Sequence, residues 1–92
     1  MTDSTSFVWV FSPFGKTYPS AVFSSEKRAR EWIEKHMCKG TLTEYPVDIS
    51  AYDYAVAVGD FRPKIDRHRS DEFVSSFSNA TGRHFHFDMD DE

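Results

Sequence analysis

The stretch Phe7-Val8-Trp9-Val10-Phe11 sets the architecture expected of this chain. All five residues are aromatic or β-branched, the types that favour β-strands. Because no polar residue alternates with them, the pattern predicts a strand that is covered on both faces and lies in the middle of its sheet. A turn signal follows at Ser12–Gly15, and a second strand is expected over residues 17–23. Pro19 interrupts this second strand, which predicts either an edge strand or a strand with a bulge, and the two strands are close enough to form a hairpin.

Three helices are expected after the hairpin, each preceded by a residue that can cap it. The first begins after Ser24 or Ser25, and Gly40 is expected to end it in the left-handed conformation. Its apolar stripe follows the spacing i, i+3, i+4, i+7 and i+8. The residues at these positions are Ala29, Trp32, Ile33, His36 and Met37.

The second helix is expected to begin after Asp48 or Ser50 and to run to about Val58, and the third begins after Ser70. The side chains of the second helix that should face the core are Tyr52, Ala55 and Val56. Those of the third helix are Phe73, Val74 and Phe77.

Two further strands are expected, over residues 41–45 and 83–87, with Phe85 and Phe87 pointing inward. The resulting order, β-β-α-β-α-α-β, predicts an α+β domain. Its sheet is mixed or antiparallel, with about four strands and with two to three helices on one face. The last strand is expected to pair beside the first, because no other segment offers a partner for so apolar a strand.

The 92 residues fit a single domain, in which residues 1–6 and 88–92 are expected to be disordered tails. Fifteen Asp and Glu against eleven Lys and Arg give a net charge of −4. Four of the acidic residues are Asp88, Asp90, Asp91 and Glu92, so the excess lies in an acidic C-terminal tail. The polar N-terminus has no signal-peptide pattern, and no apolar stretch is long enough to span a bilayer. We therefore expect a cytoplasmic protein that engages no membrane.

Several segments together resemble a family of small, mostly bacterial proteins catalogued as a domain of unknown function. The segments that carry the resemblance are Val8-Trp9-Val10-Phe11, Pro19-Ser20-Ala21-Val22-Phe23, Ala29 with Trp32-Ile33 and His36, residues 40–48 (GTLTEYPVD), Tyr52-Asp53-Tyr54-Ala55, Phe61-Arg62-Pro63 and His84-Phe85-His86-Phe87. The sequence departs from the family pattern at Tyr54, where Trp is usual, and at Phe85 and Phe87, where Tyr is usual. The resemblance covers nearly the whole chain and implies a single domain. It brings no catalytic residue.

His84 and His86 are the candidate metal ligands, because residues two apart on a strand share one face. Neighbouring imidazoles can bind zinc, copper or nickel, and Asp88 has the parity of a third ligand. The alternative interpretation is that both histidines are polar residues on the solvent face of a half-buried strand. Because a metal site needs at least three ligands and supporting contacts, no cofactor is expected.

Other patterns that carry chemistry are absent from the sequence. Cys38 is the one cysteine, so no intramolecular disulfide can form, and His36 points elsewhere on its helix. The four glycines are isolated and form no phosphate-binding loop. Residues 62–69 form a basic loop, but the pI near 5.5 and the acidic tail argue against nucleic acid as a partner.

Tyr45, Tyr52 and Tyr54 are the candidate partner-binding residues, because tyrosine is enriched at protein interfaces. Helical positions 52 and 54 diverge by about 200°, so we expect one of these two rings to be exposed.

With no catalytic set, the favoured function is a non-enzymatic protein-binding module, either an immunity-type inhibitor or a small regulatory partner. Another protein is the expected partner, and a homodimer is a further option through an uncovered sheet edge or face. The alternative is a small metal-binding protein or metal-dependent enzyme that uses His84, His86 and Asp88.

Overall fold

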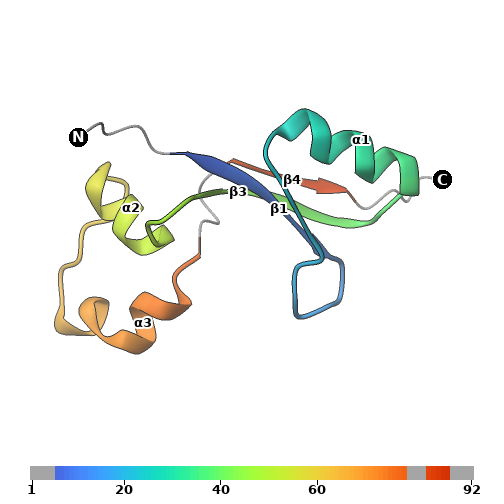
Figure 1. Cartoon of the computed structure of the whole chain (residues 1–92). Coiled ribbons are helices and arrows are strands. Elements are labelled where there is room, and N and C mark those ends of the chain that lie inside the picture. The colour runs from blue at the N-terminus through green and yellow to red at the C-terminus, as the bar shows by residue number, and fades with distance from the viewer. Residues whose placement is uncertain (1–5, 79–82, 88–92) are drawn as a thin grey trace.

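The computed structural model describes residues 6–78 and 83–87 and contains one antiparallel sheet with three helices (Figure 1). The strands are β1 (Phe7–Pro13), β2 (Ala21–Phe23), β3 (Gly40–Pro46) and β4 (His84–Phe87). The helices are α1 (Glu26–His36), α2 (Ala51–Ala57), α3 (Asp71–Ser76) and a 3-10 turn, η1 (Asp66–Arg69). The predicted order of elements is confirmed, and so is the predicted α+β class.

The strands lie in the order β2-β1-β3-β4, which confirms that the first strand is central and the second is at an edge. The expectation that the last strand pairs beside the first was wrong. Both edges of β1 are occupied, one by β2 and the other by the whole length of β3. β4 therefore pairs with the remaining edge of β3, with Thr41 opposite His86 and Leu42 opposite Phe85.

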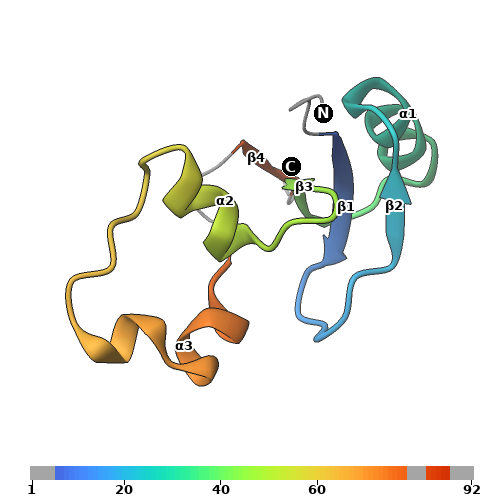
Figure 2. The same ribbon diagram turned by 60° about the vertical axis from the view of Figure 1, so that its left-hand side comes forward.

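One face of the sheet carries the core. Alternate residues of β1 and β3 point to this face, where Trp9, Phe11 and Leu42 are buried against Ala29 and Ile33 of α1. Figure 2 shows α1 packed along β1 and β2 on this side. Phe85 and Phe87 of β4 close the core from the far edge, as predicted.

The opposite face is not covered by any of the described helices, so the prediction that β1 is buried on both faces was wrong. Val8 and Val10 on that face are only half-buried. The reason is that α2 and α3 lie beyond the end of the sheet, where β1 begins and β3 ends (Figure 1). Aromatic rings hold these two helices to each other, so their apolar faces are not available to the sheet.

That second aromatic cluster gathers rings whose centres lie between 5.2 and 6.2 Å apart. Its members are Tyr52 of α2, Phe61 of the following loop, Phe73 of α3 and Phe77, which caps the end of α3. The predicted caps of both helices are confirmed, because Ser50 accepts a hydrogen bond from the Asp53 N–H and Ser70 accepts one from the Phe73 N–H. Val56, which was expected in the core, is exposed.

Helix α1 begins as predicted but ends differently. Ser25 caps it by accepting a hydrogen bond from the Arg28 N–H. The left-handed residue at its end is Met37, with φ of 53°, and not Gly40. Met37 therefore leaves the helical stripe and is 69% exposed, and His36 is exposed as well. Gly40 is instead the buried first residue of β3.

An ion-pair network on the covered face fastens β4 to α1. The Glu26 carboxylate accepts from Arg30 Nε at 2.7 Å and from Arg83 Nη2 at 3.2 Å. Arg83 also lies 4.0 Å from Glu44, which register places beside Trp9 on the core side. The Arg30 guanidinium lies over the Phe85 ring at 4.4 Å. The network thus joins α1, β3 and the start of β4.

Glu26→Gln is expected to lower the free energy of unfolding by about 0.5–1 kcal/mol, because it removes the charge shared by two arginines. Glu31→Gln is the matched control, since Glu31 contacts Lys27 at 3.9 Å in a far more exposed pair. Urea unfolding at low and at high salt gives the loss of unfolding free energy for each of the two variants. Equal losses for the two variants would contradict the role given to Glu26.

Within the described ranges, no helix has both the length and the apolar character needed to cross a membrane.

Candidate functional site

The uncovered side of the sheet, here called the open face, is the candidate functional site. Residues directly opposite each other in an antiparallel ladder point to the same face, so the register identifies every member. The open face consists of Val8, Val10, Ser12, Val22, Thr41, Thr43, Tyr45, His84 and His86.

These side chains form rows across the strands. The longest row crosses all four strands and consists of Val22, Val10, Thr43 and His84. Val8 and Tyr45 form a second row, and a third consists of Ser12, Thr41 and His86. The open face is therefore apolar toward β2 and imidazole-bearing toward β4.

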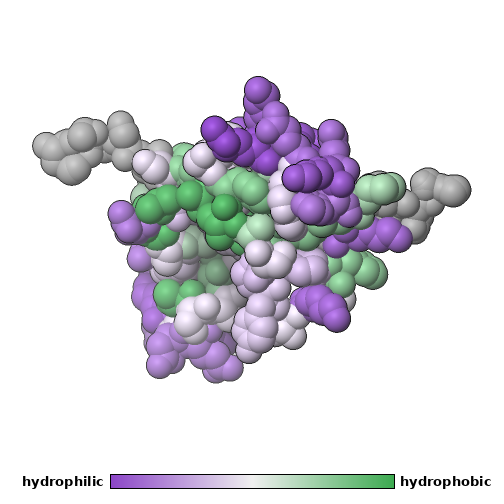
Figure 3. Space-filling view, turned by 45° about the vertical axis from the view of Figure 1, so that its right-hand side comes forward, coloured by the Kyte–Doolittle hydropathy of each residue, from purple (hydrophilic) through white to green (hydrophobic). Residues whose placement is uncertain are grey.

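None of the nine positions of the open face carries Asp, Glu, Lys or Arg, although these types make up 28% of the chain. Val22 is 62% exposed. Figure 3 shows strongly hydrophilic side chains at the top, over α1, and again at the lower left, with hydrophobic and pale side chains between them. Charged residues are depleted in the centres of protein interfaces, and aromatic residues are enriched there. The open face shares with interface centres the lack of charged residues, and Tyr45 is its one tyrosine.

The structure brings three of the predicted site residues together on this face, namely Tyr45, His84 and His86. It separates the other tyrosines from them. Tyr52 is only 8% exposed and belongs to the second aromatic cluster. Tyr54 points the other way, as expected from its position, but it is half-buried with its ring edge-on to Phe7 at 5.6 Å. Asp88 lies outside the described residues.

The two histidines lie side by side at the β4 end of the open face. Their ring centres are 5.1 Å apart with the planes nearly perpendicular. His86 Nδ1 lies 3.3 Å from the Thr41 hydroxyl of the neighbouring strand. Across residues 6–78 and 83–87, no group of three or more His, Cys, Asp and Glu side chains is placed to hold a metal ion. The described part of the chain thus places two imidazoles, and no third ligand, at this point.

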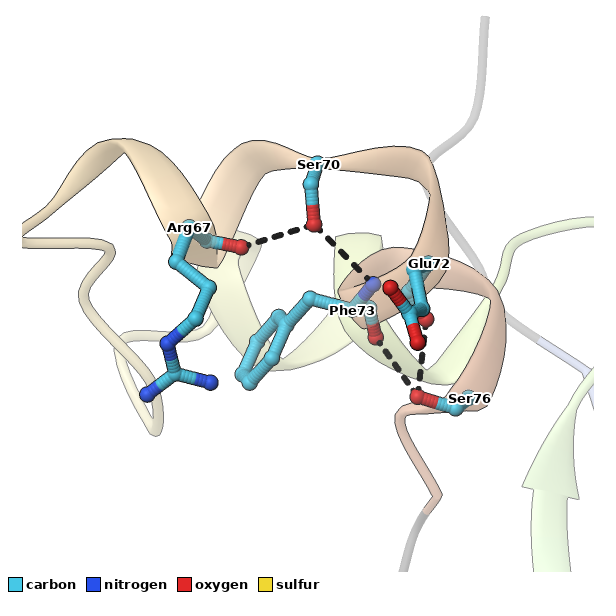
Figure 4. A pocket seen from close by; sticks show the side chains of 5 residues that line it. All are labelled: Arg67, Ser70, Glu72, Phe73 and Ser76. Carbon is cyan, nitrogen blue, oxygen red and sulfur yellow. Dashed lines mark hydrogen bonds between the residues drawn. The ribbon is translucent and has the colours of Figure 1, made fainter.

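A hollow of about 240 Å³ beside α3 is an alternative site (Figure 4). It is lined by Arg67, Ser70, Glu72, Phe73 and Ser76. Its hydroxyls are already engaged, because Ser70 donates to the Arg67 carbonyl and Ser76 donates to the Glu72 carbonyl. The Arg67 guanidinium lies 5.7 Å from the centre of the Phe73 ring. These contacts account for the polar groups of the hollow as parts of η1 and the capped helix α3.

The basic loop and the cysteine have structural roles in the described chain. Arg69 donates to the carbonyls of Ile65 and Pro63, which folds the loop back on itself. His68 Nδ1 accepts from the Lys64 N–H. Cys38 is half-buried against the core.

Sequence reasoning missed the valines of the open face, because it took the first strand to be covered on both sides. A signal was present in the sequence. The alternate positions of this strand are Val8, Val10 and Ser12, and those of the third strand are Thr41, Thr43 and Tyr45. A solvated strand face usually carries charged residues, and these two carry none.

Comparison with known proteins gives a match to a family model, described as a domain of unknown function (DUF7710), over residues 8–92. No curated protein sequence and no solved structure matches the chain.

Proposed function

Since the chain belongs to the DUF7710 family of unknown function, as its resemblance indicated, we propose a function from the geometry: a non-enzymatic module that binds another protein through its open face. An immunity-type inhibitor and a small regulatory partner are both functions of this kind.

The observation that supports this proposal is a four-stranded face with no charged side chain and, among the described elements, no covering helix. Docking on such a face desolvates no ion, which is the costly step when surfaces associate. Each square ångström of apolar area removed from water contributes roughly 25 cal/mol. Val22, Val10 and Val8 supply that area, and the hydroxyls of Thr43 and Tyr45 supply hydrogen-bonding groups beside it.

Val22→Lys is expected to abolish partner binding, because it places a charge on the apolar end of the open face. Val22 is exposed, so its replacement leaves the core intact. Val58→Lys is the matched control: Val58 is 49% exposed and lies at the end of α2, away from the open face. The purified chain and both variants serve as baits for lysate of the parent organism, and bound proteins are quantified by mass spectrometry.

The proposal predicts one protein that is retained by the parent chain and by Val58→Lys, and that is lost at least tenfold with Val22→Lys. Circular dichroism verifies that all three baits are folded. Equal recovery with Val22→Lys would place the binding surface elsewhere, and the absence of any stoichiometric protein would count against a binding module.

A further inference from the structure

We infer that the histidine pairs of two copies of this chain bind one Zn²⁺ ion, with His84 and His86 of each copy as its four ligands. The inference rests on the proposed function, because it names a second copy as a protein that the open face binds. It assigns a role to the β4 end of that face, whereas the valines at the β2 end carry the proposed function itself.

The spacing of the two rings fits a shared metal. Zn–N bonds of about 2.0–2.1 Å place each imidazole centre about 3.2 Å from the ion, and two rings at a tetrahedral angle then have centres about 5.2 Å apart. The ring centres of His84 and His86 are 5.1 Å apart. The pair therefore has the separation that two ligands of one zinc ion require.

Thr41 orients one of the ligands. His86 Nδ1 lies 3.3 Å from the Thr41 hydroxyl oxygen, so Nδ1–H can donate to it and leave Nε2 with a free lone pair. Histidines that bind metals usually donate their other N–H to such an acceptor, which fixes the tautomer and the ring orientation.

A second copy is the source of the remaining ligands. Zinc takes four ligands in structural sites, and the described residues of one chain supply two. A two-fold axis beside β4 would bring the histidine pair of one copy next to the pair of the second copy, which gives four imidazole ligands. β4 is the outermost described strand and His86 is exposed, so the pair lies at the rim of the sheet where another copy can reach it. None of the nine positions of the open face carries Asp, Glu, Lys or Arg, so none of these side chains has to be desolvated there when two copies meet.

The other histidines have different surroundings. His36 packs on Trp32 at the end of α1, with ring centres 5.6 Å apart. His68 lies among the rings of the second aromatic cluster, 5.1 Å from Phe73. Neither has an imidazole neighbour, so His36→Ala is a control that keeps the proposed ligands.

The test is a titration of the full chain, carrying no histidine tag, with Zn²⁺. Calorimetry gives the stoichiometry and light scattering gives the mass. We expect one Zn²⁺ per two chains and a rise from 10.7 kDa to about twice that mass, reversed by EDTA. His84→Ala and His86→Ala should each abolish both effects, and His36→Ala should abolish neither. Thr41→Val should weaken zinc binding by about tenfold or more while leaving the fold intact.

Binding of one Zn²⁺ per chain without a change in mass would overturn the inference, since all ligands would then come from one copy. So would a dimer that forms equally well in EDTA, or a titration that shows no zinc binding. Failure of the zinc site is distinguishable from failure of the proposed function. Partner recovery that depends on Val22, in a chain whose calorimetric titration shows no zinc binding, would retain the latter while overturning the former.

Discussion

Phe11→Ala is expected to lower the free energy of unfolding by about 3–5 kcal/mol, a range typical of truncating a buried aromatic residue. Phe11 is 2% exposed and is the largest of the fully buried side chains. Its ring meets Trp32 of α1 edge-on at 5.6 Å, and its strand lies between β2 and β3. The truncation leaves a cavity where the helix meets the sheet, and close-packed neighbours only partly refill such a space.

A chain of this length is stabilised by only about 5–14 kcal/mol, so Phe11→Ala removes a large share of its stability. Thermal unfolding followed by circular dichroism should show a fall in Tm of at least about 12 °C. Val22→Ala is the control on the same sheet, because Val22 is exposed on the open face. It should cost less than about 1 kcal/mol. Similar losses for both variants would mean that the covered face is not the core.

Gly40→Ala is expected to cost about 2–3 kcal/mol, although it adds a single methyl group. A Cβ at this position would clash with the backbone carbonyl oxygen of Ser12 and lie 2.7 Å from Phe11 Cζ. Gly40 is opposite Pro13 in the ladder between β1 and β3. The clash with the Ser12 oxygen is relieved only if the two strands separate, and the contact with Phe11 requires its ring to move as well.

Gly15→Ala separates this steric effect from the conformational preference of glycine. Gly15 has φ of +77°, and a Cβ added there would meet no atom beyond its chain neighbours within 4 Å, whereas Gly40 has no positive φ. Gly15→Ala should cost about 1–2 kcal/mol through backbone strain alone. Urea unfolding of both variants gives the comparison. A Gly40→Ala chain as stable as the parent would show that the strands tolerate a side chain there.

The Phe11→Ala and Gly40→Ala variants also test what holds the open face in place. Its rows exist because β1, β3 and β4 keep one register, in which Val10 lies opposite Thr43 and Thr43 lies opposite His84. A shift of one residue would turn these side chains toward α1. The close approach at Gly40 and the packing of Phe11 fix that register. Partner binding and zinc binding should therefore fail in any variant that displaces β3 from β1.

Much of the secondary structure could be predicted because its causes are local. Ser25, Ser50 and Ser70 each accept a hydrogen bond from a backbone N–H three residues ahead, so the start of each helix is determined within one turn of chain. The aromatic and β-branched run of β1 likewise marks a central strand by its own composition. His84 and His86 share a face because of strand geometry alone.

Contacts between distant parts of the chain decide three features that local sequence does not. These are where β4 pairs, why residue 40 is glycine, and what surrounds the tyrosines. Thr41 meets His86 across 45 residues, and Gly40 is glycine because Phe11 and Ser12 lie against it. Tyr52 and Tyr54 diverge as helical geometry requires, yet Tyr54 is covered by Phe7 from a different element. Local preferences fix which residues form strands and helices. Which strands pair and which face stays open depend on how the elements divide the apolar surface among them, and here α2 and α3 bury theirs against each other and leave one side of the sheet open.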